Sequence, residues 1–114
     1  MNGNQVPLIY SLKNKQNFSS TVKNGRFTNL GIMQVRYKHI NDCNSWNLGI
    51  VCPKKIIKLS TDRNKIRRRI KHAFRDFITN QKINNAGCVV IFVKAEYSKM
   101  SYQSILANLK SLDL

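Results

Sequence analysis

The residues best suited to chemistry in this chain are its cations, and they are unevenly distributed. The 114 residues include 20 Lys and Arg against 5 Asp and Glu, which gives a formal charge of +15. Half of the cations fall in one short stretch: Lys54, Lys55, Lys58, Arg63, Lys65, Arg67, Arg68, Arg69, Lys71 and Arg75. Such a charge attracts polyanions, so nucleic acid is the first partner it predicts and an anionic membrane surface the second.

The basic stretch has helical spacing. At about 100° per residue, one stripe that can face a sheet holds Ile66, Ile70, Ala73, Phe74 and Phe77. A second side holds Asn64, Arg67, Arg68, Lys71 and Arg75, and a third flank holds Lys65, Arg69 and His72. A helix that is only solvated intersperses acids for i,i+4 pairs. The second side has none, so the pattern favours contacts with phosphates.

The chain has few residues suited to metal binding or to side-chain catalysis. Three cysteines (Cys43, Cys52 and Cys88) and two histidines (His39 and His72) form no close ligand pair, so we expect reduced cysteines and no zinc site. The five carboxylates are scattered, whereas a two-metal nuclease needs several acids at one site. No catalytic residue is therefore expected in this chain.

The remaining sequence predicts one α+β domain over 1–114, with a flexible segment over 1–11. Helices are expected over 17–23 with Asn17 as cap, over 62–77 with Thr61 as cap, and after the cap Ser101. Strands are expected over 27–37, 46–52 and 88–93, with a turn over 41–45 and a loop over 84–87. No apolar run approaches a membrane span and no secretory signal is visible, so a cytoplasmic protein is expected.

The basic helix carries a specific pattern. Segment 63–71 reads Arg-Asn-Lys-Ile-Arg-Arg-Arg-Ile-Lys and follows a strand that ends in Pro53-Lys54-Lys55. This set resembles the R-N-x-x-K-R-x-x-R signature of the bacterial ribonuclease P protein component, and the resemblance covers roughly residues 12–112. Departures occur at Arg67, Lys71 and His72, where the family usually has Lys, Arg and Glu.

The resemblance implies the protein subunit of a ribonucleoprotein that cleaves the 5′ leader from precursor tRNA. It implies that the RNA subunit carries the chemistry and binds the catalytic Mg²⁺, and that one protein binds one RNA without an obligate protein partner. It also implies a mostly antiparallel sheet, the element order αβββαβα and a left-handed βαβ crossover.

The resemblance further assigns two sets of residues. The face toward the RNA subunit would comprise Arg63, Asn64, Lys65, Arg67, Arg68, Lys71 and Arg75. The cleft for the leader would comprise Phe18, Val22, Arg36, Lys54 and Lys55.

Three alternatives stay open at this point. Phe18 is either a platform on which bases stack or a core residue that shares a helix face with Val22. The chain as a whole resembles this protein subunit, and another basic RNA-binding module, such as a ribosomal protein, is the second reading of it. A stand-alone nuclease is the third reading, and cleavage by RNA-free protein would reveal it.

Overall fold

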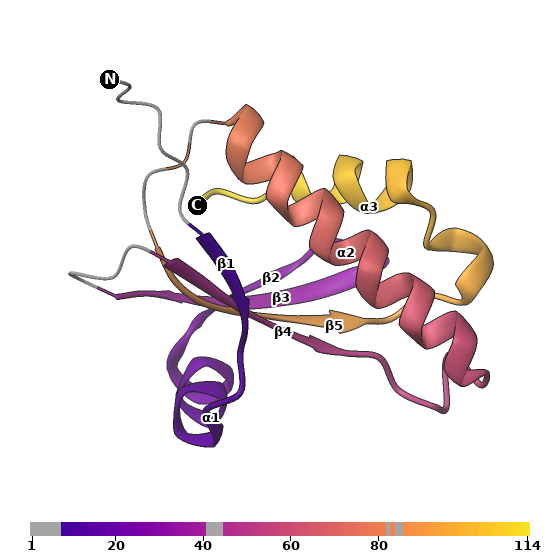
Figure 1. Ribbon diagram of the computed structural model, residues 1–114, viewed down its shortest axis with the longest axis horizontal. Coiled ribbons are helices and arrows are strands. Elements are labelled where there is room, and N and C mark those ends of the chain that lie inside the picture. Colours follow the sequence, from indigo (N-terminus) through magenta and orange to yellow (C-terminus); the bar gives the residue numbers. More distant parts are fainter. Residues whose placement is uncertain (1–7, 41–44, 82, 84–85) are drawn as a thin grey trace.

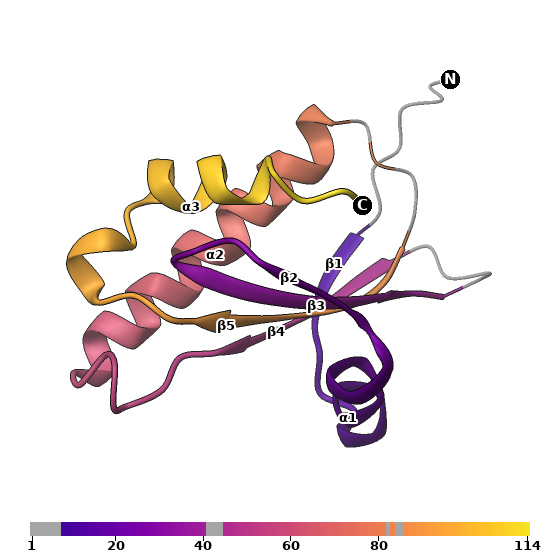
Figure 2. The same ribbon diagram turned by 180° about the vertical axis from the view of Figure 1, so that it is seen from behind.

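The structure is a computed structural model, and it describes residues 8–40, 45–81, 83 and 86–114 (Figures 1 and 2). The strands are β1 (Leu8–Ser11), β2 (Arg26–Asn29), β3 (Met33–His39), β4 (Ser45–Val51) and β5 (Gly87–Val93). The helices are α1 (Lys15–Asn24), α2 (Ser60–Asn80), the 3-10 helix η1 (Tyr97–Lys99) and α3 (Tyr102–Leu109). The expected α+β class with three α-helices is confirmed. None of the helices in the described ranges is long and apolar enough to cross a membrane.

The five strands form one mixed sheet in the order β1-β4-β5-β3-β2. β4 is parallel to both β1 and β5, whereas β3 is antiparallel to both β5 and β2. The sheet is therefore not mostly antiparallel, because two of its four pairings are parallel. The second parallel pairing comes from β1, which pairs with β4. β1 also precedes α1, so it is an additional element before the expected order αβββαβα.

Residues 8–11, expected within a flexible segment over 1–11, form the strand β1, and residues 1–7 of that segment lie outside the described residues. Ile9 pairs with Trp46 of β4 and packs at the border of the core, which gives the strand a hydrophobic anchor. Its neighbours Leu8 and Tyr10 are exposed. With a single anchoring side chain in four residues, the strand depends on its pairing with β4, and sequence periodicity alone does not reveal it.

The connection β4–α2–β5 is a βαβ crossover between adjacent parallel strands. In Figure 1, β4 lies nearer the viewer than β5, both strands run from left to right, and α2 returns above the sheet. This path turns anticlockwise as it recedes, so the crossover is left-handed, the rare sense that the resemblance implied.

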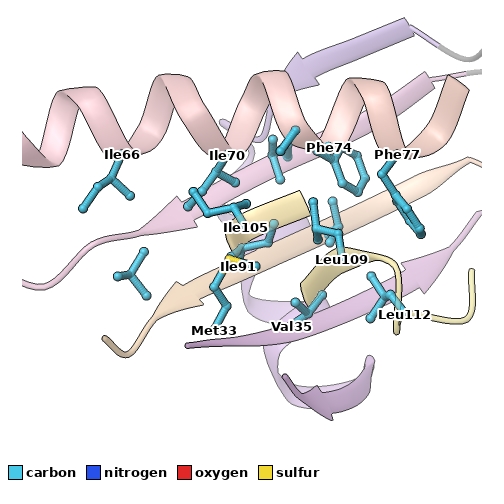
Figure 3. Close-up of a cluster of buried hydrophobic side chains, with 14 of the residues drawn as sticks. Met33, Val35, Ile66, Ile70, Phe74, Phe77, Ile91, Ile105, Leu109 and Leu112 are labelled. Carbon is cyan, nitrogen blue, oxygen red and sulfur yellow. The ribbon is translucent and has the colours of Figure 1, made fainter. Parts of the chain in front are cut away.

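The core lies between the sheet and the pair α2 and α3, while α1 covers the opposite face (Figure 1). Figure 3 shows side chains from α2, α3, β3 and β5 meeting in this layer. The stripe predicted for the basic helix is confirmed, since its five members are all buried: Ile66, Ile70, Ala73, Phe74 and Phe77.

Several boundaries differ from the sequence expectations. The cap of α1 is Asn14, whose side chain accepts from the Asn17 amide, so the helix begins earlier than Asn17. α2 begins at Ser60, one residue before the expected cap Thr61, and has no side-chain cap bond. Ser101 caps α3 as expected, through a bond from the Ser104 amide.

The segment expected as one strand over 27–37 is divided into β2 and β3. The chain turns at Gly31, whose φ of +99° is a conformation that side chains with a Cβ rarely adopt. The expected turn over 41–45 lies outside the described residues except for Ser45, which begins β4. Positions 84–85 of the expected loop also lie outside them, and Gly87 already belongs to β5.

Candidate nucleic-acid interface

The start of α2 is fixed by contacts within the chain. Pro53 ends the run of β4, and its carbonyl accepts from the amides of Ile56 and Ile57 in the following turn. Arg63 then donates through Nη1 to the carbonyls of Ile57 and Lys58, both at 2.9 Å. Arg63 is half-buried, so part of its guanidinium holds the loop ahead of the helix and does not face solvent.

The outer side of α2 is a continuous cationic surface. Its members are all exposed and come from four successive turns of the helix: Asn64, Arg67, Arg68, Lys71 and Arg75. In the described part of the chain, the side chains of the four cations form no ion pair or hydrogen bond. We call these five residues the basic face. Four unneutralised charges along one helix face give a surface that attracts an extended polyanion.

A groove of about 380 Å³ runs beside the basic face, between α2 and the edge of the sheet. The last contact between the β1 segment and β4 is the Leu12 amide to the Leu48 carbonyl at 2.9 Å, after which the chain turns toward α1. The edge of β4 at Gly49 and Ile50 is consequently open to the groove. Its lining combines apolar and cationic groups: Ser11, Leu12, Leu48, Gly49, Ile50, Arg67, Arg68 and Lys71.

Phe18 and Val22 lie on the face of the sheet that α1 covers, and both are half-buried. The Phe18 ring rests on Gly49, because a Cβ added there would lie 3.3 Å from it. The absence of a side chain at Gly49 therefore creates the seat for this ring. Phe18 has both a packing contact and exposed ring area.

Arg36 lies on the same face, since β3 sends Met33, Val35 and Tyr37 to the core and the alternate residues to the other side. Its guanidinium lies 4.8 Å from the centre of the Phe27 ring, which comes from the paired position of β2. Phe27 is 48% exposed. Phe27 is not among the predicted site residues, because only the register of β2 against β3 places it beside Arg36.

Lys54 and Lys55 are exposed and lie in the turn that follows β4. They add two cations between the N-terminal end of α2 and the end of β4, the strand whose Gly49 contacts Phe18. Part of each predicted set lies along β4, because Gly49 contacts Phe18 and also lines the groove beside Arg67, Arg68 and Lys71. Arg36 lies further away, on β3, with β5 between β3 and β4.

Lys65 lies on the third flank of α2, away from the basic face. There it lines a second pocket with Arg68, Arg69, His72 and Tyr102. Arg69, half-buried, donates to the Met100 carbonyl at 3.1 Å and to the Tyr97 hydroxyl at 3.0 Å. Arg69 is not among the predicted site residues, and no local pattern indicates its contacts, because both partners lie about thirty residues further along the chain.

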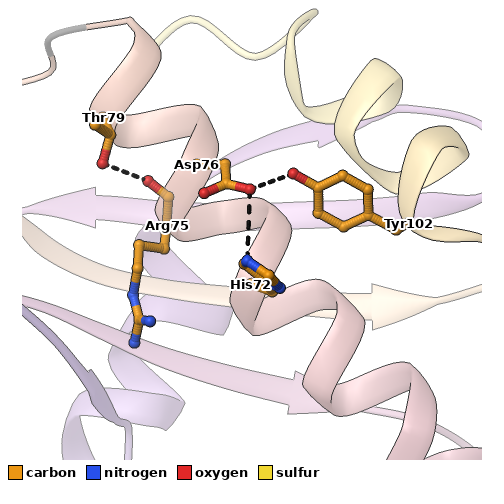
Figure 4. A network of polar contacts seen from close by, with 5 residues as sticks. All are labelled: His72, Arg75, Asp76, Thr79 and Tyr102. Carbon is orange, nitrogen blue, oxygen red and sulfur yellow. Dashed lines mark hydrogen bonds and ion pairs between the residues drawn. The ribbon is translucent and has the colours of Figure 1, made fainter.

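The carboxylates of the described residues do not gather into a metal site, and no group of three His, Cys, Asp or Glu side chains converges there. Asp76 accepts a hydrogen bond from the Tyr102 hydroxyl and lies 3.7 Å from Nε2 of His72 (Figure 4). The bond to Asp76 raises the pKa of the Tyr102 phenol. This arrangement is a polar link between α2 and α3, and its donor set does not fit a cage for a divalent cation.

The fold recurs in solved structures of ribonuclease P proteins. The RNase P protein from Thermotoga maritima superposes with a TM-score of 0.72 at 21% identity, covering 90% of this chain and 97% of that one. The RNase P protein of Staphylococcus aureus gives a TM-score of 0.67 at 21% identity, with 90% of each chain covered. At this level of identity the likeness concerns the fold.

Fold and surface together define a small α+β protein that presents one cationic helix beside an open sheet edge. The model of the Ribonuclease P family matches residues 7–113. The ribonuclease P protein component of Clostridium kluyveri is 30% identical over 104 residues, which are 91% of each sequence. The chain belongs to the ribonuclease P protein family.

Proposed function

We propose that this chain is the protein subunit of ribonuclease P, which binds the catalytic RNA subunit and assists removal of the 5′ leader from precursor tRNA. The observation that carries the proposal is the basic face of α2 in a chain of this family. Four cations are exposed there without acidic partners among the described residues, while the opposite side of the same helix is buried in the core. Exposed cations along one side of a helix whose other side is buried are suited to binding an external polyanion.

The basic face contacts the RNA subunit in this proposal. Arg67, Arg68 and Arg75 offer planar forks for bidentate contacts with phosphate oxygens, and Lys71 adds a point charge. Asn64 adds donors and an acceptor for sugar or phosphate groups. Arg63 contributes mainly by fixing the loop before α2, since its Nη1 is engaged by two carbonyls.

The leader of precursor tRNA binds along the face of the sheet beside α1. Phe27 is exposed there and Phe18 is partly exposed, and the Arg36 guanidinium lies over the Phe27 ring. Aromatic rings stack on the bases of a single strand without demanding a sequence, while Lys54 and Lys55 attract its backbone. Val22 completes the wall at α1.

Hydrolysis of the leader takes place in the RNA subunit. Metal-assisted phosphodiester cleavage needs Mg²⁺ held by several oxygen ligands. The described carboxylates of this chain do not converge, so the RNA supplies the Mg²⁺ sites in this proposal. The protein contributes charge neutralisation and leader binding, and it acts as an accessory subunit of an endoribonuclease.

The experiment that tests the partner is a titration of the purified protein with the ribonuclease P RNA of the same organism, beside a ribosomal RNA fragment of equal length. The proposal predicts saturation at one protein per ribonuclease P RNA and much weaker binding to the ribosomal fragment at physiological salt. Equal affinity for both RNAs would instead support a general basic RNA-binding module.

A further inference from the structure

The second pocket lies on the flank of α2 that faces α3, away from most of the basic face. Its volume is about 480 Å³, and it is lined by Lys65, Arg68, Arg69, His72 and Tyr102. Four of these five residues are absent from the other groove, and Arg68 alone lines both. α2 therefore carries a cationic concavity on each side.

One wall of this pocket is held rigid. The Arg69 guanidinium donates to the Met100 carbonyl and the Tyr97 hydroxyl, and it lies 5.0 Å from the centre of the Tyr97 ring. These contacts fix the direction of a cation at the pocket without neutralising its charge. A preorganised guanidinium loses little side-chain entropy when it binds an anion.

The other wall is aromatic. The rings of His72 and Tyr102 lie with their centres 5.5 Å apart and tilted by 56°. Asp76 contacts both side chains: it accepts the hydrogen bond from the Tyr102 hydroxyl and lies 3.7 Å from Nε2 of His72 (Figure 4). The carboxylate that could compete for the pocket's cations is thus engaged by these two side chains.

The remaining cations of the pocket are free to bind. Lys65 and Arg68 are exposed, and they make no ion pair within the described part of the chain. A concavity with three cations and two aromatic rings matches a nucleotide unit, in which an anionic phosphate adjoins a flat base and a ribose. Its volume also falls in the range of sites for small organic groups.

We propose that the pocket between α2 and α3 binds a nucleotide unit of an RNA segment, with its phosphate on Lys65, Arg68 and Arg69 and its base or ribose against His72 and Tyr102. Because the first groove lies on the other flank, α2 is placed between two RNA segments, and Arg68 contacts both. This inference rests on the proposed function, which supplies the RNA, and it adds a second contact region to the basic face.

Site-specific crosslinking tests the pocket directly. A benzoylphenylalanine placed at position 72 probes the α2–α3 pocket, one at position 71 probes the basic face, and one at position 110 serves as a distant control. With ribonuclease P RNA, we expect crosslinks from positions 72 and 71 to two different RNA segments, and none from position 110. Crosslinks from position 71 without any from position 72 would overturn the second contact region, whereas none from either position would overturn the proposed function itself.

A matched pair of variants measures the contribution to binding. Lys65→Ala/His72→Ala removes two exposed side chains from the pocket, and Lys110→Ala/Ser111→Ala removes the same formal charge at the end of α3. We expect the first to weaken binding of ribonuclease P RNA about three- to tenfold and the second to change it less than twofold. Equal losses in the two variants, with unchanged melting temperatures, would show that only net charge matters there.

Discussion

Phe18 is the residue at which packing and leader binding are most directly opposed, so its replacement gives a decisive prediction. The ring rests on Gly49 with part of its surface in solvent. Replacing a fully buried Phe by Ala costs about 3–5 kcal/mol. Phe18 is mostly but not fully buried, so its replacement should cost somewhat less, about 2–4 kcal/mol, and the melting temperature should fall by roughly 8–16 °C.

The effect on binding should be confined to RNA that carries a leader. Stacking of one base on an aromatic ring contributes about 1–3 kcal/mol, which corresponds to roughly 5- to 150-fold in affinity. We expect Phe18→Ala to weaken the binding of precursor tRNA to the assembled enzyme within that range. Mature tRNA has lost the leader, so its affinity should stay within twofold.

A second variant separates stability from stacking. Phe18→Leu keeps an aliphatic contact with Gly49 but has no ring face, so it should recover most of the stability and little of the affinity for precursor tRNA. Both tRNAs are titrated against holoenzyme assembled with each variant, and thermal unfolding of each free protein is recorded in parallel. Equal losses for precursor and mature tRNA, or full recovery of precursor binding in Phe18→Leu, would refute the stacking role and leave Phe18 as a packing residue.

Three further outcomes follow from the contacts of single side chains. Arg68→Ala and Lys71→Ala should each weaken assembly with ribonuclease P RNA and reduce the log–log salt slope by about 0.7–0.9, whereas Lys110→Ala should not; unchanged slopes in a filter-binding salt series would contradict the basic face. Arg69→Ala should lower the free energy of unfolding by about 1–3 kcal/mol in a urea titration, because its two hydrogen bonds join α2 to the η1 region, and an unchanged midpoint would show that these bonds contribute nothing. Burial raises the pKa of the Cys52 thiol despite two nearby arginines, so at pH 8 folded protein holds less Cys52 thiolate than unfolded protein. Iodoacetamide should therefore modify Cys52 only on unfolding, and peptide mass mapping of native and denatured protein checks this.

The helices that pack through regular local patterns could be predicted from the sequence. The stripe from Ile66 to Phe77 repeats at helical spacing, and the same spacing places the basic face on the other side of α2. Ser101 was predicted as a cap because its bond to the Ser104 amide lies within one turn. Such features depend on neighbours a few residues apart.

Features that depend on distant partners could not be predicted in this way. β1 exists through pairing with β4, more than thirty residues away, and Phe27 joins Arg36 only once the register of β2 against β3 is set. Arg69 had no expected role, because Met100 and Tyr97 reach it only after the chain has crossed the sheet. The pocket between α2 and α3 was missed for the same reason.

The accessory role of the protein is tested by measuring cleavage of precursor tRNA by the protein alone, by ribonuclease P RNA alone and by the two together at low Mg²⁺. We expect no cleavage by the RNA-free protein and a clear increase when the protein is added to the RNA, since its cations offset repulsion between the two RNAs. Cleavage by repurified protein that persists after nuclease removal, or no increase in cleavage when protein is added to the RNA, would show that the protein is not an accessory subunit of this enzyme.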